Sequence, residues 1–304
     1  MSLDLDKRQR AMLREMGVRV WQPLASAADR APATVAINTA SADARPKRAE
    51  AGEDVKSQPV SRKMADAVAP DRAPTVAQDL RLQPRPAGID AMDWPTLQAA
   101  VAGCRACRLC QSRKNTVFGV GPALPADAPA GAAPQIDWLI VGEAPGENED
   151  LAGEPFVGSA GQLLDNMLRA MKLQRGSDAA VPGAGVSNSV FITNVLKCRP
   201  PANRNPEPDE VAQCAPYLKR QVELLQPRII LALGRFAAQS LLQDSVHDVY
   251  KIPLGKLRGQ VHGYLGVPVV VSYHPAYLLR SLADKAKAWD DLCLAMALLK
   301  RPDS

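Results

Sequence analysis

The chain has 304 residues, more than one compact domain of about 150 residues needs but not clearly enough for two. Its formal charge of +5 is mildly basic, which suits a polyanionic partner without requiring one. No apolar run approaches the roughly 20 residues that span a bilayer, and charges occupy the N-terminus where a secretory signal has its apolar core. These features argue against a membrane protein and predict a cytoplasmic one.

The first 22 residues interleave apolar and basic side chains, which predicts an amphipathic helix ended by Gly17 and Pro23. Residues 23–90 contain no Phe, Trp or Tyr and cannot bury enough apolar surface to offset their ordering entropy, so a disordered linker is expected. A helix on such a linker is either a docking peptide or an element that folds back on the core. Its pattern is similar to the N-terminal peptide of the psi subunit of bacterial clamp loaders, which implies a replication or repair protein as partner.

The globular domain is expected over residues 91–304, and four of its cysteines form two separated pairs. The pairs are Cys104 with Cys107, and Cys198 with Cys214. Four thiolates so arranged can complete a ligand set for zinc or for a [4Fe-4S] cluster, whereas structural disulfides are the weaker interpretation in a cytosolic chain. Cys110 is near enough to the first pair to be a substitute ligand, and Cys293 is expected in the core.

A polar, glycine-rich loop, residues 142–150, follows an apolar run of strand length at residues 136–141. Apolar side chains then recur at helical spacing from Leu163 to Met171, so the unit is a strand, a long loop and a helix. Ligands bind at the carboxyl ends of strands in open α/β sheets, and glycine lets the backbone approach a ligand closely. This loop is therefore predicted to form the floor of an active site, the alternative being a tight connection with solvated acids.

Phe156 strengthens the functional interpretation of this loop. An aromatic side chain between Pro155 and Gly158 is a poor choice for a mere connection, but it gives a platform on which a flat base can stack. The loop matches neither the Walker A pattern nor GxGxxG, so a nucleoside triphosphatase is not expected.

The second predicted strand, residues 190–197, contains Asn194 among apolar neighbours. A buried amide must find partners, which are either a neighbouring loop or the edge of a base whose donor and acceptor it matches. The loop after this strand carries Arg199 and Arg204, which are candidates for neutralising DNA phosphates with help from Lys197; otherwise their charges are simply solvated.

Two more strands are predicted at residues 228–234 and 267–272, with a hairpin-like stretch at 256–264 between them. Strands that alternate with helices form a parallel sheet, so His274, after the last strand, should emerge at the same edge as Glu143 and Asn194. This convergence favours a catalytic role for His274 over a structural one. The loops 119–135 and 175–189 are expected to be flexible surface insertions.

Four segments of the chain resemble the signature segments of the family 4 uracil-DNA glycosylases. They are Gly142-Glu143-Ala144-Pro145-Gly146, Glu154-Pro155-Phe156-Val157-Gly158, Thr193-Asn194-Val195-Leu196-Lys197-Cys198-Arg199-Pro200-Pro201 and His274-Pro275-Ala276-Tyr277-Leu278-Leu279. The resemblance covers roughly residues 95–300 and includes the spacing of the four cysteines.

The resemblance implies an α/β fold, a three-layer α/β/α sandwich with a central, mainly parallel sheet, and removal of uracil from DNA by a monomer. It implies a [4Fe-4S] cluster on the four paired cysteines. It places the substrate-binding residues at Gly142, Phe156 and Asn194 and the catalytic histidine at His274. Better-known glycosylases of the superfamily carry an aspartate where this chain has Ala144, so Glu143 is the first candidate to orient the water, ahead of Glu149 and Asp150.

The residues after His274 are candidates for contacting the duplex. An enzyme that extrudes a base must fill the gap, and Tyr277, Leu278 and Leu279 are predicted to wedge into the duplex with Arg280 on a phosphate. Ordinary packing in the first helical turn is an equal alternative for the apolar ones.

Two rival functions use the same residues differently. One is a non-catalytic or covalently trapping uracil-DNA binder of the same fold, although relatives of that type carry a histidine in the loop that residues 199–205 form here, and this chain has none. The other is a zinc-bound DNA-binding module in which Glu143 and His274 are incidental.

Overall fold

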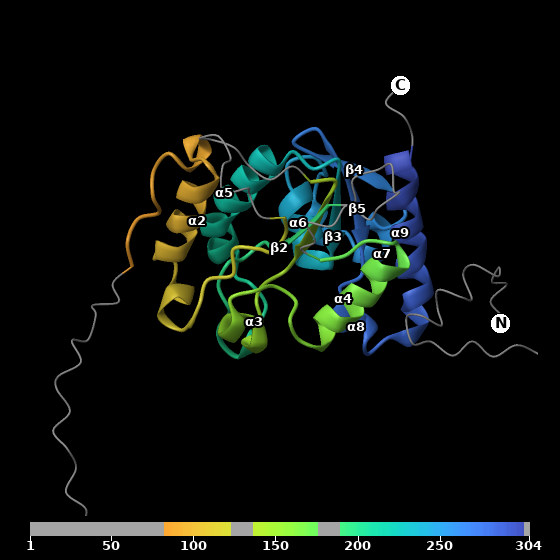
Figure 1. The fold of residues 1–304 in the computed structure, drawn as a ribbon, viewed down its shortest axis with the longest axis horizontal. Coiled ribbons are helices and arrows are strands. Elements are labelled where there is room, and N and C mark those ends of the chain that lie inside the picture. The colour runs from red at the N-terminus through yellow and green to blue at the C-terminus, as the bar shows by residue number, and fades with distance from the viewer. Residues whose placement is uncertain (1–81, 123–135, 176–188, 301–304) are drawn as a thin grey trace, which may run out of the picture. The chain divides into compact units, whose positions relative to one another are not determined.

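The computed structural model describes residues 82–122, 136–175 and 189–300 (Figure 1). The α-helices are α2 (Trp94–Gly103), α3 (Glu147–Ala152), α4 (Ser159–Ala170), α5 (Pro208–Leu225), α6 (Arg235–Leu242), α7 (Leu254–Leu257), α8 (Pro275–Leu278) and α9 (Lys285–Lys300). The strands are β1 (Trp138–Gly142), β2 (Val190–Asn194), β3 (Ile229–Leu233), β4 (Val261–Tyr264) and β5 (Val267–Ser272). Short 3₁₀ helices are η2 (Ile89–Ala91), η3 (Arg108–Gln111), η4 (Pro201–Asn203), η5 (Val249–Lys251) and η6 (Leu282–Asp284).

The five strands form one sheet in the order β2-β1-β3-β5-β4. Every neighbouring pair is parallel except β4 and β5, which run antiparallel. Strands β1, β2 and β3 are buried along their whole length, as expected for parallel strands that are covered on both faces. The chain passes from β1 outward to β2 and then back to β3 on the other side of β1, so a topological switch point lies between β1 and β3.

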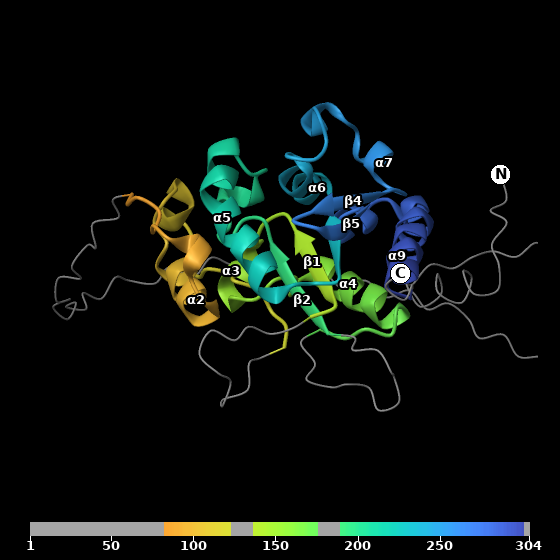
Figure 2. The same cartoon turned by 90° about the horizontal axis from the view of Figure 1, so that it is seen from above.

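Helices cover both faces of the sheet. Since successive strand residues point to opposite sides, neighbouring residues of one strand pack against different helices. Leu139 and Val141 pack in a core with side chains of α2, α5 and α6. Trp138 and Ile140 pack in a second core with side chains of α4 and α9. Figure 2 shows α5 and α6 on the opposite side of the sheet from α4 and α9. The prediction of a three-layer α/β/α sandwich with a mainly parallel sheet is confirmed.

The strand predictions hold with two changes. The second strand ends at Asn194 rather than at residue 197, although residues 195 and 196 still donate backbone hydrogen bonds to the carbonyls of Gly142 and Glu143. The predicted hairpin shifts along the chain: β4 pairs with β5 through a turn at Leu265 and Gly266, both with positive φ, as two-residue hairpin turns require. Part of the residues predicted as the first hairpin arm form α7 instead.

The predicted linker and the first predicted insertion both contain residues that pack on the domain. Within residues 82–90, Ile89 is buried in the core and Arg85 donates to the carbonyls of Ala212 and Gln213 in α5. Val120 bridges Ile192, so the edge of β2 is covered. The predicted N-terminal helix and residues 23–81 of the linker lie outside the described residues.

None of the helices within the described ranges is both long enough and apolar enough to cross a membrane.

Candidate active site

Four strand ends meet at one edge of the sheet and carry the residues that the sequence singles out. Gly142 and Asn194 are direct neighbours in the register of β1 and β2. Across the switch point, Gly234 after β3 donates its N–H to the carbonyl of Ser272 at the end of β5. Gly234 has φ +91°, and a Cβ there would lie 3.0 Å from the Cβ of His274. The expected convergence of the β1, β2 and β5 loops is therefore present.

Gly142 forms the floor between two predicted substrate-binding side chains. A Cβ at this position would lie 2.3 Å from Oδ1 of Asn194 and 2.6 Å from Cζ of Phe156. Such distances do not occur for real Cβ atoms, so Asn194 and Phe156 can close over the backbone here only because residue 142 is glycine.

Phe156 is buried and has φ 56°, an unusual conformation for a bulky residue. Its carbonyl oxygen would lie 1.7 Å from a Cβ at Gly161, so the first turn of α4 admits the loop only with glycine there. The Phe156 ring stacks on the imidazole of His274, with the ring centroids 5.4 Å apart and the planes inclined by 27°. The predicted platform and the predicted catalytic histidine are thus neighbours.

Two side chains that the sequence interpretation missed hold Phe156 in place. Arg175 donates to the carbonyls of Pro155 and Phe156 and pairs with Asp165 at 3.0 Å. The sequence predicts a surface insertion that begins at residue 175, so this role of Arg175 is unexpected. A long-range contact of this kind leaves no local pattern in the sequence.

Glu149 and Asp150, the secondary candidates for orienting water, have structural roles instead. The Glu149 carboxylate accepts backbone hydrogen bonds from Gly146, Val157 and Gly158, and so ties α3 to the Phe156 loop. The buried Asp150 carboxylate accepts from the backbone N–H groups of Lys114 and Asn115. Since their lone pairs serve these backbone donors, both are set aside as water ligands.

Glu143 is the carboxyl group that remains for that task. Burial raises the pKa of Glu143 to about 7, and the nearby Arg235 guanidinium opposes the shift. Arg235 is exposed at the start of α6, after β3, so the pair lies at the switch point of the sheet. A carboxyl group with a pKa near neutrality is suited to accept a proton from water.

His274 is neutral, and its tautomer follows from its hydrogen bond. Burial lowers the pKa of His274 to about 4, although the charge of Glu149 acts in the opposite direction. Nδ1 of the ring accepts a hydrogen bond from the backbone N–H of Ala276 at 3.2 Å. Because Nδ1 is an acceptor, the single ring proton resides on Nε2, which is left as a donor.

Asn194 is buried, and within the three described ranges its carboxamide has no hydrogen-bond partner. Its backbone is held firmly, because Nζ of Lys197 donates to the Asn194 carbonyl at 2.8 Å, to Thr193 and to Gln221. The expectation that Lys197 assists phosphate binding is therefore wrong: the side chain is fully buried, and its donors point into the protein.

The predicted phosphate-binding arginines are engaged with neighbouring side chains. Arg204 makes a bidentate pair with the buried Glu210 at 2.6 and 2.9 Å, which raises the pKa of the arginine. Arg199 donates to Asn203 at 2.8 Å and lies 3.5 Å from Glu147, so it links its loop to α3. Both cations stabilise this loop.

The segment after His274 corrects one wedge residue. Leu278 is completely buried in the core that includes α4 and α9, so it cannot enter a duplex, and the alternative of ordinary helix packing is the correct one for it. Tyr277, Leu279 and Arg280 are exposed. A further exposed apolar residue that the sequence interpretation missed is Leu282.

This exposed segment is braced from below. Tyr273 stacks on Tyr277 with ring centroids 5.0 Å apart, and the Tyr277 hydroxyl donates to Asp284 at 2.7 Å. Arg258 lies over the Tyr273 ring at 4.2 Å and pairs with the buried Asp291 of α9 at 2.7 Å. The brace fixes the direction in which the segment faces away from the protein.

The four paired cysteines line one small cavity of about 20 Å³, together with Cys110. Burial raises the pKa of Cys198 to about 11 and that of Cys214 to about 12, and the charges of other cysteines add to both shifts. Within the described residues, no three His, Cys, Asp or Glu side chains are grouped closely enough to hold a single metal ion. Cys293 packs at the edge of the core around α9, as expected.

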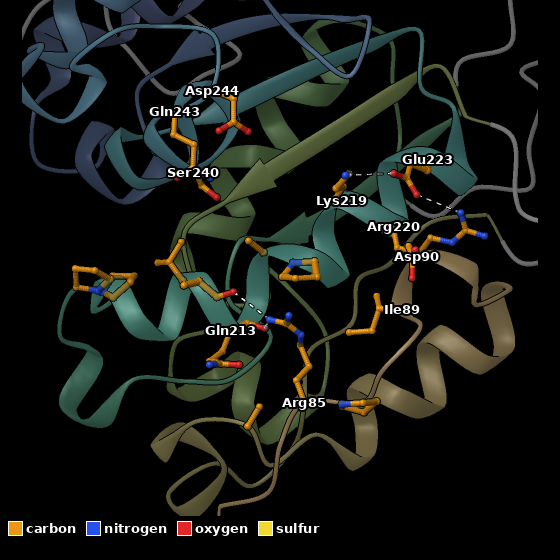
Figure 3. A pocket seen from close by; sticks show the side chains of 18 of the residues that line it. Arg85, Ile89, Asp90, Gln213, Lys219, Arg220, Glu223, Ser240, Gln243 and Asp244 are labelled. Carbon is orange, nitrogen blue, oxygen red and sulfur yellow. Dashed lines mark hydrogen bonds and ion pairs between the residues drawn. The ribbon is translucent and has the colours of Figure 1, made fainter.

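A much larger cavity of about 1310 Å³ lies between the segment before α2 and helices α5 and α6, and it shares Ala106 and Gln213 with the wall of the cysteine cavity (Figure 3). Four of its charged side chains are engaged within the protein: Arg85 donates to carbonyls of α5, and Lys219 and Arg220 both pair with Glu223. None of the residues predicted to contact the base lines it. Size alone therefore does not identify the active site.

Comparisons with known proteins agree with this geometry. A model of the uracil DNA glycosylase superfamily matches residues 129–293, more than half of the chain. A type-4 uracil-DNA glycosylase of Pyrobaculum aerophilum is 38% identical over 207 residues, covering 67% of this chain and 93% of the relative.

Two more type-4 uracil-DNA glycosylases are similar. That of Archaeoglobus fulgidus is 40% identical over 59% of this chain and 79% of its own length. That of Thermotoga maritima is 36% identical over 66% of this chain and 92% of its own length. The chain therefore belongs to the uracil DNA glycosylase superfamily and, within it, to the type-4 uracil-DNA glycosylases.

Proposed function

We propose that this chain hydrolyses the N-glycosidic bond of deoxyuridine in DNA, releases uracil and so begins base excision repair. The observation that carries the proposal is the close grouping of Gly142, Phe156, Asn194 and a neutral His274 at the edge of the parallel sheet. The group combines a flat apolar platform, a free carboxamide and an uncharged donor. A pyrimidine base needs these three features to be held and to leave.

Base recognition is assigned to Asn194. Its oxygen accepts from uracil N3–H and its nitrogen donates to uracil O4, whereas cytosine presents the reverse arrangement at these positions. The carboxamide is free for this purpose within the described residues, while Lys197 fixes the backbone that carries it. The buried ring of Phe156 supplies the stacking surface.

Departure of the base is assigned to His274. When the bond from the sugar C1′ to uracil N1 breaks, the bonding electrons go to uracil, and negative charge accumulates on its O2. We assign the donor to that oxygen to the Nε2–H of neutral His274, a role supported by the hydrogen bond from the Ala276 N–H that occupies Nδ1. Loss of one such donor to a developing oxyanion costs on the order of 3 kcal/mol.

Completion of the reaction is assigned to Glu143. A water molecule attacks the C1′ of the oxocarbenium-like sugar, and its proton passes to the Glu143 carboxylate. The pKa of Glu143, raised to about 7 by burial, suits that transfer at neutral pH. In this role the Glu143 carboxylate replaces the aspartate that better-known glycosylases carry at the position of Ala144.

Access to the base is assigned to the exposed part of the segment after His274. Extruding a nucleotide costs a few kcal/mol, and an apolar side chain that fills the vacated space recovers part of it. Tyr277 and Leu279 are exposed on this segment for that purpose, and Arg280 beside them suits a phosphate.

We propose a [4Fe-4S] cluster rather than zinc for the cysteine cavity. A single zinc ion needs all of its sulfur ligands about 2.3 Å from one point, and no such close group exists among the described residues. In a four-iron cluster each thiolate binds a different iron, which needs wider spacing. Cys104, Cys107, Cys198 and Cys214 nevertheless line one cavity with no histidine in its wall. Bound there, the cluster would link the segment before the sheet to the loop after β2.

The N-terminal 22 residues complete the proposal as a docking peptide for a replication or repair protein. Its support is the amphipathic pattern and the similarity of that pattern to the N-terminal peptide of the psi subunit of bacterial clamp loaders. The test is a pull-down from a cell lysate with a peptide of residues 1–22 and a scrambled control peptide. If neither peptide retains a replication or repair protein, the docking proposal is wrong.

The activity is tested with the full-length protein, purified without oxygen, on an oligonucleotide with one uracil. We expect free uracil and an alkali-labile site with the wild type, and a loss of roughly 100-fold or more with Asn194→Ala. Stable covalent capture of the DNA without free uracil would support the trapping binder instead. A zinc protein that binds the same DNA and leaves it intact would support the DNA-binding module.

A further inference from the structure

Arg113 connects the two segments that carry the cysteines. Its Nη1 donates to Sγ of Cys198 at 2.9 Å, across 85 positions of the sequence. Its Nη2 donates to the carbonyl of Cys104 at 2.7 Å and to that of Ala102 at 3.3 Å. One guanidinium thus holds the Cys-x-x-Cys segment and the loop after β2 together at the wall of the cysteine cavity.

We propose that Arg113 is a positioning residue for the [4Fe-4S] cluster, and that it raises the cluster's reduction potential and slows iron loss. The inference rests on the proposed cluster, and it adds a role for a residue outside the four ligands. It concerns the cluster environment and leaves the uracil pocket untouched.

The physical reason is the charge of the bound centre. Four thiolates around an oxidised cluster core of charge +2 would give a net charge of −2, at a site where Cys198 is buried and Cys104, Cys107 and Cys214 are partly buried. A partly buried guanidinium that donates to one of the sulfurs offsets part of that charge. Reduction adds another negative charge, so the cation stabilises the reduced cluster more than the oxidised one.

A second sulfur has a weaker donor. The backbone N–H of Lys197 lies 3.3 Å from Sγ of Cys214. This donor remains whatever side chain residue 197 carries, whereas the Arg113 contact can be removed by mutation. Hydrogen bonds to cluster sulfurs are one of the determinants of potential that the protein controls.

Arg108 supplies the matched control. It lies in η3, five positions before Arg113, and it is exposed. Among the interactions of the described residues, it makes no contact with a cysteine sulfur. Arg108→Gln removes the same charge from the same segment and preserves the bond to Cys198.

The experiment compares wild type, Arg113→Gln, Arg113→Lys and Arg108→Gln as anaerobically purified full-length proteins. Iron content, the midpoint potential from the visible spectrum and the rate of iron loss to a chelator are measured, with circular dichroism as a check of folding. In Arg113→Gln we expect the ratio of oxidised to reduced cluster at a fixed potential to rise about tenfold, which is about 59 mV for one electron. Iron loss should also accelerate several-fold.

The variants separate a tuning role from a merely structural one. Arg113→Lys keeps the charge and should recover part of the potential, and Arg108→Gln should match the wild type. If Arg113→Gln folds with the wild-type potential and iron-loss rate, the proposal is wrong. If it does not fold, Arg113→Lys replaces it: lysine keeps the charge but lacks the two-armed contact to Cys198 and Cys104, so wild-type potential and iron loss in this variant would contradict the positioning role. A wild type that releases uracil but contains no iron removes the cluster and this inference together, and leaves the glycosylase assignment intact.

Discussion

Gly142 and Asn194 are partners in the register of β1 and β2. The Asn194 side chain can occupy its position only because residue 142, a glycine, has no Cβ. Since a Cβ at residue 142 would lie 2.3 Å from Oδ1 of Asn194 and would also meet the Phe156 ring, Gly142→Ala must displace both. A displacement of about 1 Å in a site of this kind costs on the order of 100-fold in rate. We expect that loss in kcat/KM for uracil release.

Gly255→Ala is the control for this change, because a Cβ at Gly255 meets no atom within 4 Å. It should retain wild-type kcat/KM. Wild-type kcat/KM in Gly142→Ala, measured on the same uracil oligonucleotide, would contradict the arrangement of the floor.

The pH profile of the reaction should be governed by Glu143. Its pKa is raised from the ordinary 4.5 to about 7 by burial, and the ionised form is the one that accepts a proton from water. We therefore expect kcat/KM to rise with pH through a midpoint near 7. His274 contributes no limb above pH 5, because its pKa is lowered to about 4 and the ring is already neutral there. Initial rates measured between pH 5 and 9, with Glu143→Gln as the comparison, test this: the variant should be slow and should lack the rise.

The same pKa makes an opposite prediction for stability. A carboxyl group whose pKa is higher in the folded state favours folding when protonated, so its contribution is fully present below about pH 4.5 and is lost as pH rises through 7. Glu143→Gln should therefore unfold at a higher temperature than the wild type at pH 8, with a smaller difference at pH 5. Thermal unfolding at the two pH values checks this, and equal midpoints at pH 8 would argue against a buried, perturbed carboxyl group.

The parts of the site that lie on regular strands could be predicted from the sequence. Asn194 and His274 follow apolar runs, and the topology of a parallel sheet brings such strand ends together. Gly142 and Phe156 were recognisable because glycine lets the backbone approach a ligand closely and an isolated aromatic residue is an unusual choice in a loop. Leu278 and Leu279, by contrast, have the same chemistry, and only the packing on α4 and α9 decides which one is buried.

The supporting contacts could not be predicted, because they join segments far apart in the chain. Arg175 and Arg113 reach across 19 and 85 positions to Phe156 and Cys198. An arginine in a polar loop looks solvated in a sequence, and its role depends on which carbonyl or sulfur the fold places within reach. Glu149 likewise resembles a site carboxylate in the sequence, because the backbone donors that it binds come from the folded Phe156 loop and from the start of α3.

Arg175 should matter for the pocket although it does not line the base-contacting group. Arg175→Met removes the donors to the carbonyls of Pro155 and Phe156 and leaves the positive φ of Phe156 less well supported. Losing hydrogen bonds from a charged donor costs about 1.5 kcal/mol, which corresponds to about tenfold in affinity. We expect inhibition by free uracil to weaken by about that factor, together with kcat/KM.

Arg169→Met is the control for Arg175→Met, since Arg169 lies on α4 and its side chain bonds only Asn166 among the described residues. This variant should be inhibited by free uracil as strongly as the wild type and should have the wild-type kcat/KM. Unchanged inhibition by uracil in Arg175→Met would show that the Phe156 platform holds its position without this anchor.

The adjacent residues Leu278 and Leu279 should separate folding from duplex opening. Leu278→Ala creates a cavity in the core and should lower the free energy of unfolding by about 2–5 kcal/mol. Leu279 is exposed, so Leu279→Ala should change that free energy by less than about 0.5 kcal/mol.

If Leu279 fills the space left by the extruded base, Leu279→Ala lowers kcat/KM on duplex uracil DNA about tenfold. The value on single-stranded DNA stays nearly unchanged, since that strand has little stacking to replace. Single-turnover assays of each variant on both DNAs test this. Equal losses of kcat/KM on the two substrates in Leu279→Ala would show that Leu279 is not the wedge, which would leave Tyr277 or Leu282 for that role.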